Sequence, residues 1–475
     1  MEEHEIVIGL EVHAELLTES KLFCACSTRF GSEPNSQVCP VCAGFPGTLP
    51  VMNRKAIELA LKAAVALNCQ PASFSRFARK NYFYPDLPKN YQISQYEEPL
   101  ASGGHMTIDG RNIRLKRIHM EEDAGKLIHS QGESGHSFVD FNRSCVPLVE
   151  IVTEPDIRNS MEAEKFLLAL KKTLEYLEVS DCNMEEGSLR CDANVSVRKK
   201  GATELGVKTE IKNMNSFKAV RKSIDYEANR QVSMLRKGEK LAQETRLWNE
   251  TLQITESMRS KEEAHDYRYF PDPDLVPFTV DNRWIEKITA QVGELPSQRR
   301  ERFMKDYGLS EYDAGVLTSA KSMADYFEEC IKRYPKPKIV ANWIMGDLAA
   351  LLKTARMTIE ASPVTPENLV KIVMQIEEGK ITGTIAKTVL QECFSTGKEP
   401  GEIIKEKNLV HIQDEDTINE VIRETVKENP RALNDYKNGK EQAVSYLIGQ
   451  IMRKTKGQVN PVILKKNLLE YMDKL

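Results

Sequence analysis

Four of the ten cysteines in this 475-residue chain lie close together near its N-terminus. They are Cys24, Cys26, Cys39 and Cys42, which have the spacing C-x-C-x12-C-x2-C. Two such pairs of thiolates can complete a tetrahedral Zn²⁺ site, and four protein ligands leave no open coordination position. The spacing therefore predicts a structural zinc bound within residues 24–42. Four unrelated buried thiols are the alternative.

Acidic and imidazole side chains recur where strands are expected. Glu11 and His13 share one face of an N-terminal strand, and Asp192 and Glu210 lie on the polar faces of a later hairpin. Glu150 interrupts an apolar run, where a carboxylate is costly to bury unless it is paired or binds a cation. Clustered carboxylates bind hard cations such as Mg²⁺, which also bind phosphates. The alternative is that each acid lies on a solvated strand face.

Two segments, 79–86 and 266–272, mix basic residues with tyrosine and phenylalanine. Such segments can stack a nucleobase, or they can simply anchor their own loops on a core. The Gly-Lys pairs of the chain lack the upstream glycine and the downstream Ser or Thr of a P-loop. No P-loop is therefore predicted.

Alternating apolar and polar residues predict the strands that position these groups. Residues 6–16 alternate, with Ile, Leu, Val and Ala on one face and Glu11 and His13 on the other. Residues 189–198 and 207–212 alternate in the same way and are predicted to pair as a hairpin. Helices are predicted to begin at caps, namely Asn53, Ser160, Ser216 and Thr365, the last followed by proline. Together these elements predict an α+β protein with an antiparallel sheet in its N-terminal part and helices in the rest.

Turn-prone sequences at 293–296 and 396–401 predict domain boundaries near residues 295 and 405. Residues 1–295 carry a net charge of −6 and residues 296–475 a net charge of +2. The last 45 residues hold nine basic and four acidic side chains. Because the whole chain is balanced at 66 basic and 70 acidic residues, a nucleic acid would have to bind a local patch.

Hydropathy predicts no membrane segment, because no apolar run approaches the roughly 20 residues that span a bilayer. The acidic N-terminus also lacks the basic and apolar regions of a secretory signal. We therefore expect a cytoplasmic protein.

Several ordered motifs resemble one family, the B subunits of the aspartyl/glutamyl-tRNA(Asn/Gln) amidotransferases, and the resemblance runs essentially end to end. The motifs are Val7-Ile-Gly-Leu-Glu-Val-His13, Arg79-Lys-Asn-Tyr-Phe-Tyr-Pro-Asp86, Tyr91-Gln-Ile-Ser-Gln95, His119-Met-Glu-Glu-Asp-Ala-Gly-Lys126, Met184-Glu-Glu-Gly-Ser-Leu-Arg-Cys-Asp-Ala-Asn194, Glu210-Ile-Lys-Asn-Met-Asn-Ser216 and Asp266-Tyr-Arg-Tyr-Phe-Pro271. The resemblance implies a catalytic cradle domain over 1–295 with the zinc segment 24–42 embedded in it. A helical domain over 296–405 and a helical tRNA-binding tail over 406–475 would follow.

The resemblance also implies an activity. It is the ATP-dependent amidation of mischarged Glu-tRNA(Gln), Asp-tRNA(Asn) or both, through an acyl phosphate. Ammonia would be channelled from the amidase-like A subunit, a glutaminase, and the small C subunit would complete a heterotrimer. The implied cofactors are ATP, Mg²⁺ (with Mn²⁺ as a substitute) and the structural Zn²⁺. Which tRNA is the substrate is left open.

Site residues carry over from the family pattern position by position. His13, Glu122 and Glu150 resemble Mg²⁺ ligands. Glu11, Asp192 and Glu210 resemble a neighbouring acidic set that holds a second cation or steers ammonia. The expected contacts to ATP phosphates and the acceptor end are Lys80, Ser188, Arg190, Asn194 and Lys208, and those of the tail to tRNA phosphates are Lys437, Lys440, Arg453, Lys454 and Lys456.

Two rival hypotheses remain from the residues themselves. In one, the same acids activate water in a metal-dependent phosphohydrolase and the basic tail is incidental. In the other, the chain is a non-catalytic RNA-binding scaffold with a zinc module.

Overall fold

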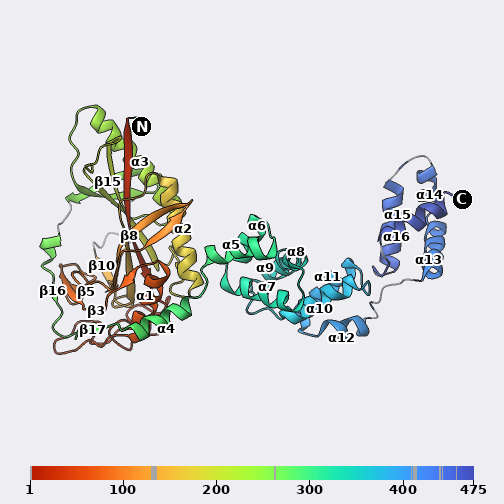
Figure 1. Cartoon of the computed structure of the whole chain (residues 1–475), viewed down its shortest axis with the longest axis horizontal. Helices are drawn as coiled ribbons and strands as arrows, with labels where there is room; N and C mark the ends of the chain where they lie inside the picture. Colours follow the sequence, from red (N-terminus) through yellow and green to blue (C-terminus); the bar gives the residue numbers. More distant parts are fainter. Residues whose placement is uncertain are drawn as a thin grey trace. The chain divides into compact units, whose positions relative to one another are not determined.

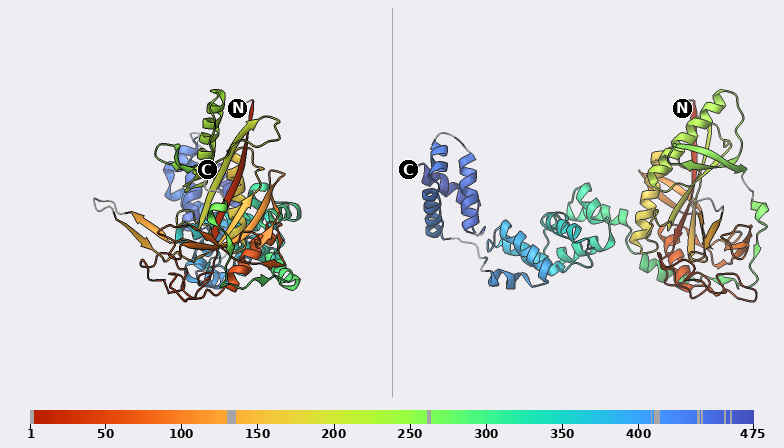
Figure 2. Two further views of the ribbon diagram at one scale, coloured as in Figure 1. Left: turned by 90° about the vertical axis from the view of Figure 1, so that its left-hand side faces the viewer. Right: turned by 180° about the vertical axis from the view of Figure 1, so that it is seen from behind.

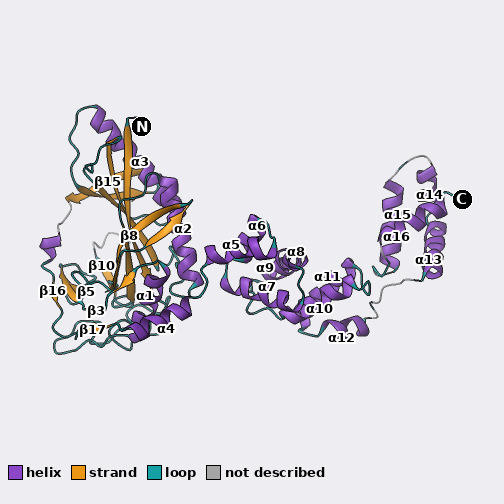
Figure 3. Cartoon of the chain, viewed as in Figure 1, coloured by secondary structure: helices purple, strands orange, loops and turns teal. Residues whose placement is uncertain are grey.

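The computed structural model describes residues 3–129, 136–260, 264–407, 409, 414–437, 440, 442–455, 457–459 and 461–475. The chain divides into two compact units, Met1–Leu295 and Pro296–Leu475. Strands are concentrated in the first unit and the second is helical (Figure 3). The predicted α+β class is confirmed.

Ten described strands of the first unit form one sheet. In spatial order they are β15 (Ile254–Ser260), β14 (Glu244–Asn249), β13 (Thr209–Lys212), β12 (Leu189–Lys199), β1 (His4–Glu15), β11 (Pro147–Thr153), β8 (Arg111–Glu122), β6 (Ala101–Ser102) and β2 (Gln70–Pro71), with β7 (His105–Ile108) also on β8. Smaller sheets pair β9 (Lys126–His129) with β10 (Ser137–Asp140), β4 (Ala78–Asn81) with β5 (Tyr91–Ser94) and β16 (Phe270–Pro271), and β3 (Phe74–Ser75) with β17 (Phe278–Thr279).

The predicted strand faces are confirmed. On β1 the side chains of Ile6, Ile8, Leu10, Val12 and Ala14 are buried, whereas Glu11 and His13 face the other side. The predicted hairpin is also confirmed, because β12 and β13 pair antiparallel with Ala193 opposite Ile211. The pair β13–β14 is parallel, unlike the other pairs in this sheet. The long helix α3 (Phe217–Arg236) between these two strands supplies the crossover that a parallel pair needs.

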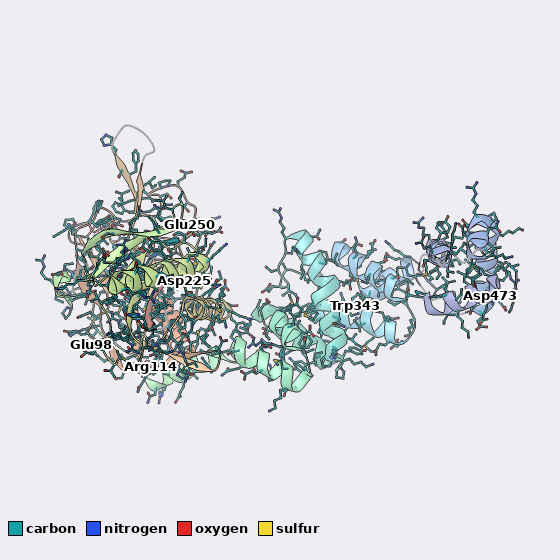
Figure 4. The ribbon with its side chains drawn as sticks, turned by 90° about the horizontal axis from the view of Figure 1, so that it is seen from above. Glu98, Arg114, Asp225, Glu250, Trp343 and Asp473 are labelled. Carbon is teal, nitrogen blue, oxygen red and sulfur yellow. The ribbon has the colours of Figure 1, made fainter. Side chains whose placement is uncertain are left out.

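Helices cover the apolar face of this sheet (Figures 1 and 2). The helix α2 (Ser160–Tyr176) packs on α3, α3 packs on β12, and α1 (Arg54–Ala66) packs on β8 and on α4 (Asn282–Val292). A short 3₁₀ helix, η1 (Ala264–Tyr267), precedes β16. On the surface, Arg114 of β8 pairs with Asp156 at 2.8 Å (Figure 4).

Three of the four predicted helix caps are confirmed. The side chains of Asn53, Ser216 and Thr365 each accept a hydrogen bond from a backbone N–H in the first turn of the helix that follows. For α2 the predicted cap was wrong by one residue. Asn159 accepts from the N–H of Glu162, and Ser160 is the first helical residue. Asparagine and serine are both good caps, so local sequence does not choose between adjacent ones.

The described helices of the second unit bury two separate apolar clusters, one drawn from residues between Phe303 and Leu409 and one from residues between Ile418 and Met472. These helices are α5 (Pro296–Tyr307), α6 (Glu311–Leu317), α7 (Lys321–Arg333), α8 (Pro337–Trp343), the π-turn η2 (Ile344–Leu348), α9 (Ala349–Ala355), α10 (Pro366–Glu377), α11 (Gly383–Thr396), α12 (Pro400–Glu406), α13 (Glu415–Glu428), α14 (Pro430–Lys437), α15 (Gln442–Lys454) and α16 (Pro461–Met472). Among the described residues, no helix has the length and apolar character needed to cross a bilayer.

Candidate active site

A cavity of about 820 Å³ opens over the polar face of the large sheet. Strands β1, β4, β8, β11, β12 and β13 and the segments beside them contribute its acidic and basic side chains. The segments after β4, after β5 and around η1 contribute tyrosines. Seven of the predicted site residues line it together, namely Glu11, His13, Lys80, Glu150, Asp192, Lys208 and Glu210.

Strand register explains why these residues meet. His13 lies opposite Glu150 in the β1–β11 pair, and Glu150 lies opposite His119 in the β11–β8 pair. Glu11 lies opposite Asp192 in the β1–β12 pair. Directly opposed residues point to the same face of a sheet, so pairing converts positions far apart in sequence into two adjacent rows of ligands.

The first group consists of His13, Glu121 and Glu150, whose ligand atoms lie within 4.8 Å of one another. The Nε2 atom of His13 is 3.3 Å from Glu121 Oε1 and 3.4 Å from Glu150 Oε2, and His119 Nε2 is 3.0 Å from Glu150 Oε2. Oxygen donors beside an imidazole suit a divalent cation such as Mg²⁺ or Mn²⁺. The residues present therefore fit a bound metal ion.

Electrostatics in this group favour the charged forms. Burial alone would lower the pKa of His13, but the carboxylates of Glu150 and Glu121 outweigh it and raise that pKa well above its ordinary value. Burial likewise opposes ionisation of Glu150, yet His119 and His13 hold its pKa well below the usual range. Against the same effect of burial, the pKa of Glu121 is held below its ordinary value, mainly by His13, so both carboxylates are in the anionic form that a metal ligand needs. A bound metal ion would replace the proton that His13 carries.

Glu122 does not join this group, and the prediction that it does is corrected. Its carboxylate lies 2.5 Å from Lys89 Nζ and accepts a hydrogen bond from the backbone N–H of Ile93 at 2.8 Å. The adjacent Glu121 takes its place beside His13. Because side chains alternate along a strand, neighbouring residues cannot both face the cavity.

A β-bulge decides which of the two glutamates faces the cavity. Ile113 and Leu115 are buried on β8, and simple alternation from them would place Glu121 on the core face and Glu122 on the polar face. The register instead shifts between two neighbouring residues of β11: Val152 pairs with Arg117, and Thr153 pairs with Leu115. Strand β8 therefore has one extra residue at this point. The extra residue reverses the alternation beyond it. The buried Ile118 and Met120 carry the signal in the sequence that could have revealed this.

The second group consists of Glu11, Asp192 and Glu210, again with ligand atoms within 4.8 Å of one another. Lys212, which the site prediction omitted, pairs with Asp192 and lies 3.5 Å from Glu210 Oε1. Thr245 donates a hydrogen bond to Glu210 at 2.9 Å. Lys212 lies two residues beyond Glu210 on β13. The alternation that predicts Glu210 on the polar face therefore predicts this lysine on the same face.

Three predicted phosphate contacts take other positions. Among the described residues that line the cavity, none is Ser188, Arg190 or Asn194. Ser188 hydrogen-bonds Asp181 in the turn before β12, and Arg190 binds both carboxylate oxygens of Asp123 at 2.9 Å. Asn194 donates to Glu11 at 2.8 Å. Within the chain, Ser188 and Arg190 thus bond to neighbouring acids and Asn194 bonds to a member of the second acidic group. Their expected contacts to ATP phosphates and the acceptor end stay a prediction.

Glu15 and Asp123 form a carboxyl pair beside Arg190 and Arg143. Burial and the carboxylate of Asp123 raise the pKa of Glu15 to about 8. Burial also opposes ionisation of Asp123, but the two arginines hold its pKa below the ordinary value. At neutral pH the protonated Glu15 can therefore donate to the ionised Asp123.

This pair predicts a pH-dependent stability. Below pH 4.5 Glu15 is protonated in both folded and unfolded chains, and between pH 4.5 and about 8 only the unfolded chain ionises. The free energy of unfolding therefore falls as pH rises through this window. Glu15→Gln cannot ionise at this position and should not show this loss. The free energy of unfolding of Glu15→Gln, taken relative to that of wild type, should therefore be higher at pH 8 than at pH 5 by on the order of 2 kcal/mol. Urea denaturation at the two pH values measures the gain, with the exposed Glu19→Gln as control. An equal pH dependence in wild type and Glu15→Gln would contradict the assignment.

The four predicted zinc-binding cysteines come together, with ligand atoms within 4.8 Å of one another. The Sγ atoms of Cys39 and Cys42 are 3.9 Å apart, and the Cys39 backbone N–H donates to Cys42 Sγ at 3.2 Å. The fully buried Lys21 amine also lies 3.6 Å from Cys42 Sγ. Four converging sulfurs with supporting donors fit a tetrahedral Zn²⁺.

Removing this metal should destabilise the first unit. We expect purified protein to contain about one zinc per chain and Cys39→Ser to lose it, with a lower melting temperature, because zinc binding free energy adds to folding free energy. Metal analysis and thermal denaturation measure both effects. Cys393→Ala, outside the quartet, should keep its zinc. Wild-type protein without zinc would overturn the prediction.

Basic residues of the tail are partly engaged by the chain itself. Lys437 donates to the carbonyl of Leu475 at 3.0 Å, Lys440 pairs with Asp435 at 2.8 Å and Lys454 pairs with Glu428 at 2.7 Å. Arg453 is exposed. Lys456 lies outside the described residues.

Carboxylates, imidazoles and lysines converge around the cavity of the first unit, as they commonly do in enzyme active sites. The family model for the GatB/GatE catalytic domain matches residues 6–286, and the model for the GatB domain matches residues 325–472. The chain is similar to proteins named as the B subunit of aspartyl/glutamyl-tRNA(Asn/Gln) amidotransferase. It is 56% identical to that of Thermoanaerobacter pseudethanolicus over 99% of this chain and 100% of the relative. It is 55% identical to that of Carboxydothermus hydrogenoformans over 100% of both chains. The chain therefore belongs to the family of amidotransferase B subunits, which are enzymes of the ligase type.

Proposed function

We propose that this chain catalyses the ATP-dependent amidation of the side-chain carboxylate on Glu-tRNA(Gln), Asp-tRNA(Asn) or both. The observation that carries the proposal is the convergence of two acidic groups with Lys80, Lys208 and Lys212 in one cavity. Acids that can hold divalent cations beside lysines suit the transfer of a phosphoryl group, which depends on alignment and charge neutralisation.

The chemistry follows from the poor leaving ability of a carboxylate oxygen. A carboxylate oxygen of the aminoacyl side chain attacks the γ-phosphorus of ATP, the bond to the β-phosphate oxygen breaks, and ADP leaves. Ammonia then attacks the carbonyl carbon of the acyl phosphate, inorganic phosphate leaves with the C–O electron pair, and a proton is lost from nitrogen. An amide on the tRNA is the product.

Each part of the cavity has a role in this scheme. His13, Glu121 and Glu150 would hold a Mg²⁺ or Mn²⁺, which supplies charge neutralisation to the transferring phosphoryl group. Lys80 and Lys208, which line the same cavity, would bind phosphate oxygens. Glu11, Asp192 and Glu210 would hold a second cation or steer the incoming ammonia.

We propose that ammonia comes from the amidase-like A subunit, a glutaminase, and that the small C subunit completes the complex. The relatives are named as the B subunit of an amidotransferase, which supports the presence of other subunits. Residues 1–295 would be the catalytic cradle, 296–405 a helical domain and 406–475 the tail that binds tRNA. The two separate apolar clusters of the second unit support the last division.

Reconstitution with both partner subunits tests the proposal. Mischarged tRNA, ATP and glutamine are supplied, and the amino acid is released from the tRNA and identified. We expect glutamine or asparagine, with ADP formed only when aminoacyl-tRNA is present and with phosphate release by amide formation only when ammonia is present as well. ATP hydrolysis without aminoacyl-tRNA would favour a phosphohydrolase, and the absence of ATP consumption would favour an RNA-binding scaffold.

A further inference from the structure

The cavity is lined by a cluster of tyrosines as well as by its acidic groups. Tyr82, Tyr96, Tyr267 and Tyr269 all line it. They come from two segments that are distant in sequence, one between β4 and Leu100 and one that runs from the end of η1 to β16. Pairing of β16 with β4 brings these segments together.

Two of these rings form a parallel stack. The ring centroids of Tyr96 and Tyr269 are 4.3 Å apart and their planes differ by 8°. Tyr267 meets Tyr269 edge-on at 6.1 Å, and Tyr82 meets Tyr267 edge-on at 6.0 Å. Tyr96 keeps 37% of its surface exposed. An aromatic pair that only anchored a loop would be expected to bury this surface, so the stack leaves aromatic area for a ligand in the cavity.

A lysine side chain lies beside these rings. The Lys80 amine lies 5.0 Å from the ring centroid of Tyr267 and 5.8 Å from that of Tyr82. Lys80 also interacts electrostatically with Glu121 and Glu150 of the first acidic group. The cavity therefore holds a flat aromatic surface, a lysine beside its rings, and carboxylates that interact electrostatically with that lysine and can hold a metal ion. These features match the two ends of a nucleotide, its base and its phosphates.

We propose that the Tyr96–Tyr269 stack is the platform for the adenine ring of an adenosine ligand bound in this cavity. The proposal rests on the proposed function, which supplies two adenosines: that of ATP and the 3′-terminal adenosine of the aminoacyl-tRNA. Stacking on an aromatic ring tolerates different bases, so the platform contributes affinity and leaves the choice of base to polar contacts.

Variants of Tyr96 in the reconstituted complex test the platform. We expect Tyr96→Ala to raise the KM for ATP about tenfold with a smaller change in kcat, since the ~1.4 kcal/mol of a tenfold change lies within the range that base–aromatic stacking contributes. Tyr96→Phe should restore most of that affinity because it keeps the ring. Tyr312→Ala, which removes a tyrosine 77% exposed in the second unit, is the control. Direct titration of each variant with ADP gives a readout that does not need turnover.

The outcomes separate the two sources of adenosine. A higher KM for ATP and weaker ADP binding assign the platform to the nucleotide, whereas a higher KM for aminoacyl-tRNA with unchanged ADP binding assigns it to the tRNA end. If neither value changes by more than twofold in a folded Tyr96→Ala, the proposal is overturned. Tyr96→Leu replaces the alanine variant if that one unfolds. A wild-type complex that binds ADP but forms no amide would contradict the proposed function while leaving the platform testable.

Discussion

Replacing Glu121 by glutamine should reduce ATP-dependent amide formation by at least ~100-fold, because the metal site of His13 and Glu150 would lose an anionic ligand. The substitution keeps the size of the side chain, so the fold should be retained. Amide formation by the reconstituted complex is measured with ammonia and with glutamine as nitrogen donors. Glutamine hydrolysis by the glutaminase partner should survive, since its chemistry does not use this cavity.

Two comparisons make this result specific. Glu204→Gln, at an exposed position between β12 and β13, removes a carboxylate outside the cavity and should amidate at the wild-type rate. Raising the Mg²⁺ or Mn²⁺ concentration should recover part of the activity of Glu121→Gln, because weakened metal binding is a matter of occupancy. Full amidation by Glu121→Gln at low Mg²⁺ would show that Glu121 is not a ligand of the metal ion.

Glu122→Ala should instead destabilise the first unit by about 3–5 kcal/mol, because it leaves the Lys89 ammonium buried without its counter-charge. Glu122 and Lys89 are both largely buried, and their ion pair joins β8 to the segment before β5. Urea denaturation of the intact chain, followed by fluorescence, measures the loss.

A double variant provides the control for this second result. Glu122→Leu combined with Lys89→Met removes both charges and keeps apolar volume, so it should recover most of the stability that Glu122→Ala loses. If Glu122→Ala and wild type unfold at the same urea concentration, the buried ion pair is not a stabilising contact. Substitution of Glu121 is thus expected to impair catalysis, and substitution of the adjacent Glu122 is expected to impair stability.

The sequence by itself determined the local structure of this protein. Alternation over β1 and β12 depends only on the twofold period of a strand, so it identified the faces that carry Glu11, His13 and Asp192. Cap residues at Asn53, Ser216 and Thr365 depend on hydrogen bonds within a few residues. The cysteine spacing likewise brought four sulfurs within reach of one another over a short segment.

Only the tertiary structure decided which side chains share the site. Three consecutive acids follow Met120, and the choice of Glu121 over Glu122 depends on a bulge that forms where β8 pairs with β11. Tyr96 meets Tyr269 because β16 pairs with β4, although the two strands lie far apart in the sequence of the first unit. Such pairings are fixed by long-range burial and register. The local pattern carries only part of this information, as the apolar Ile118 and Met120 do for the bulge.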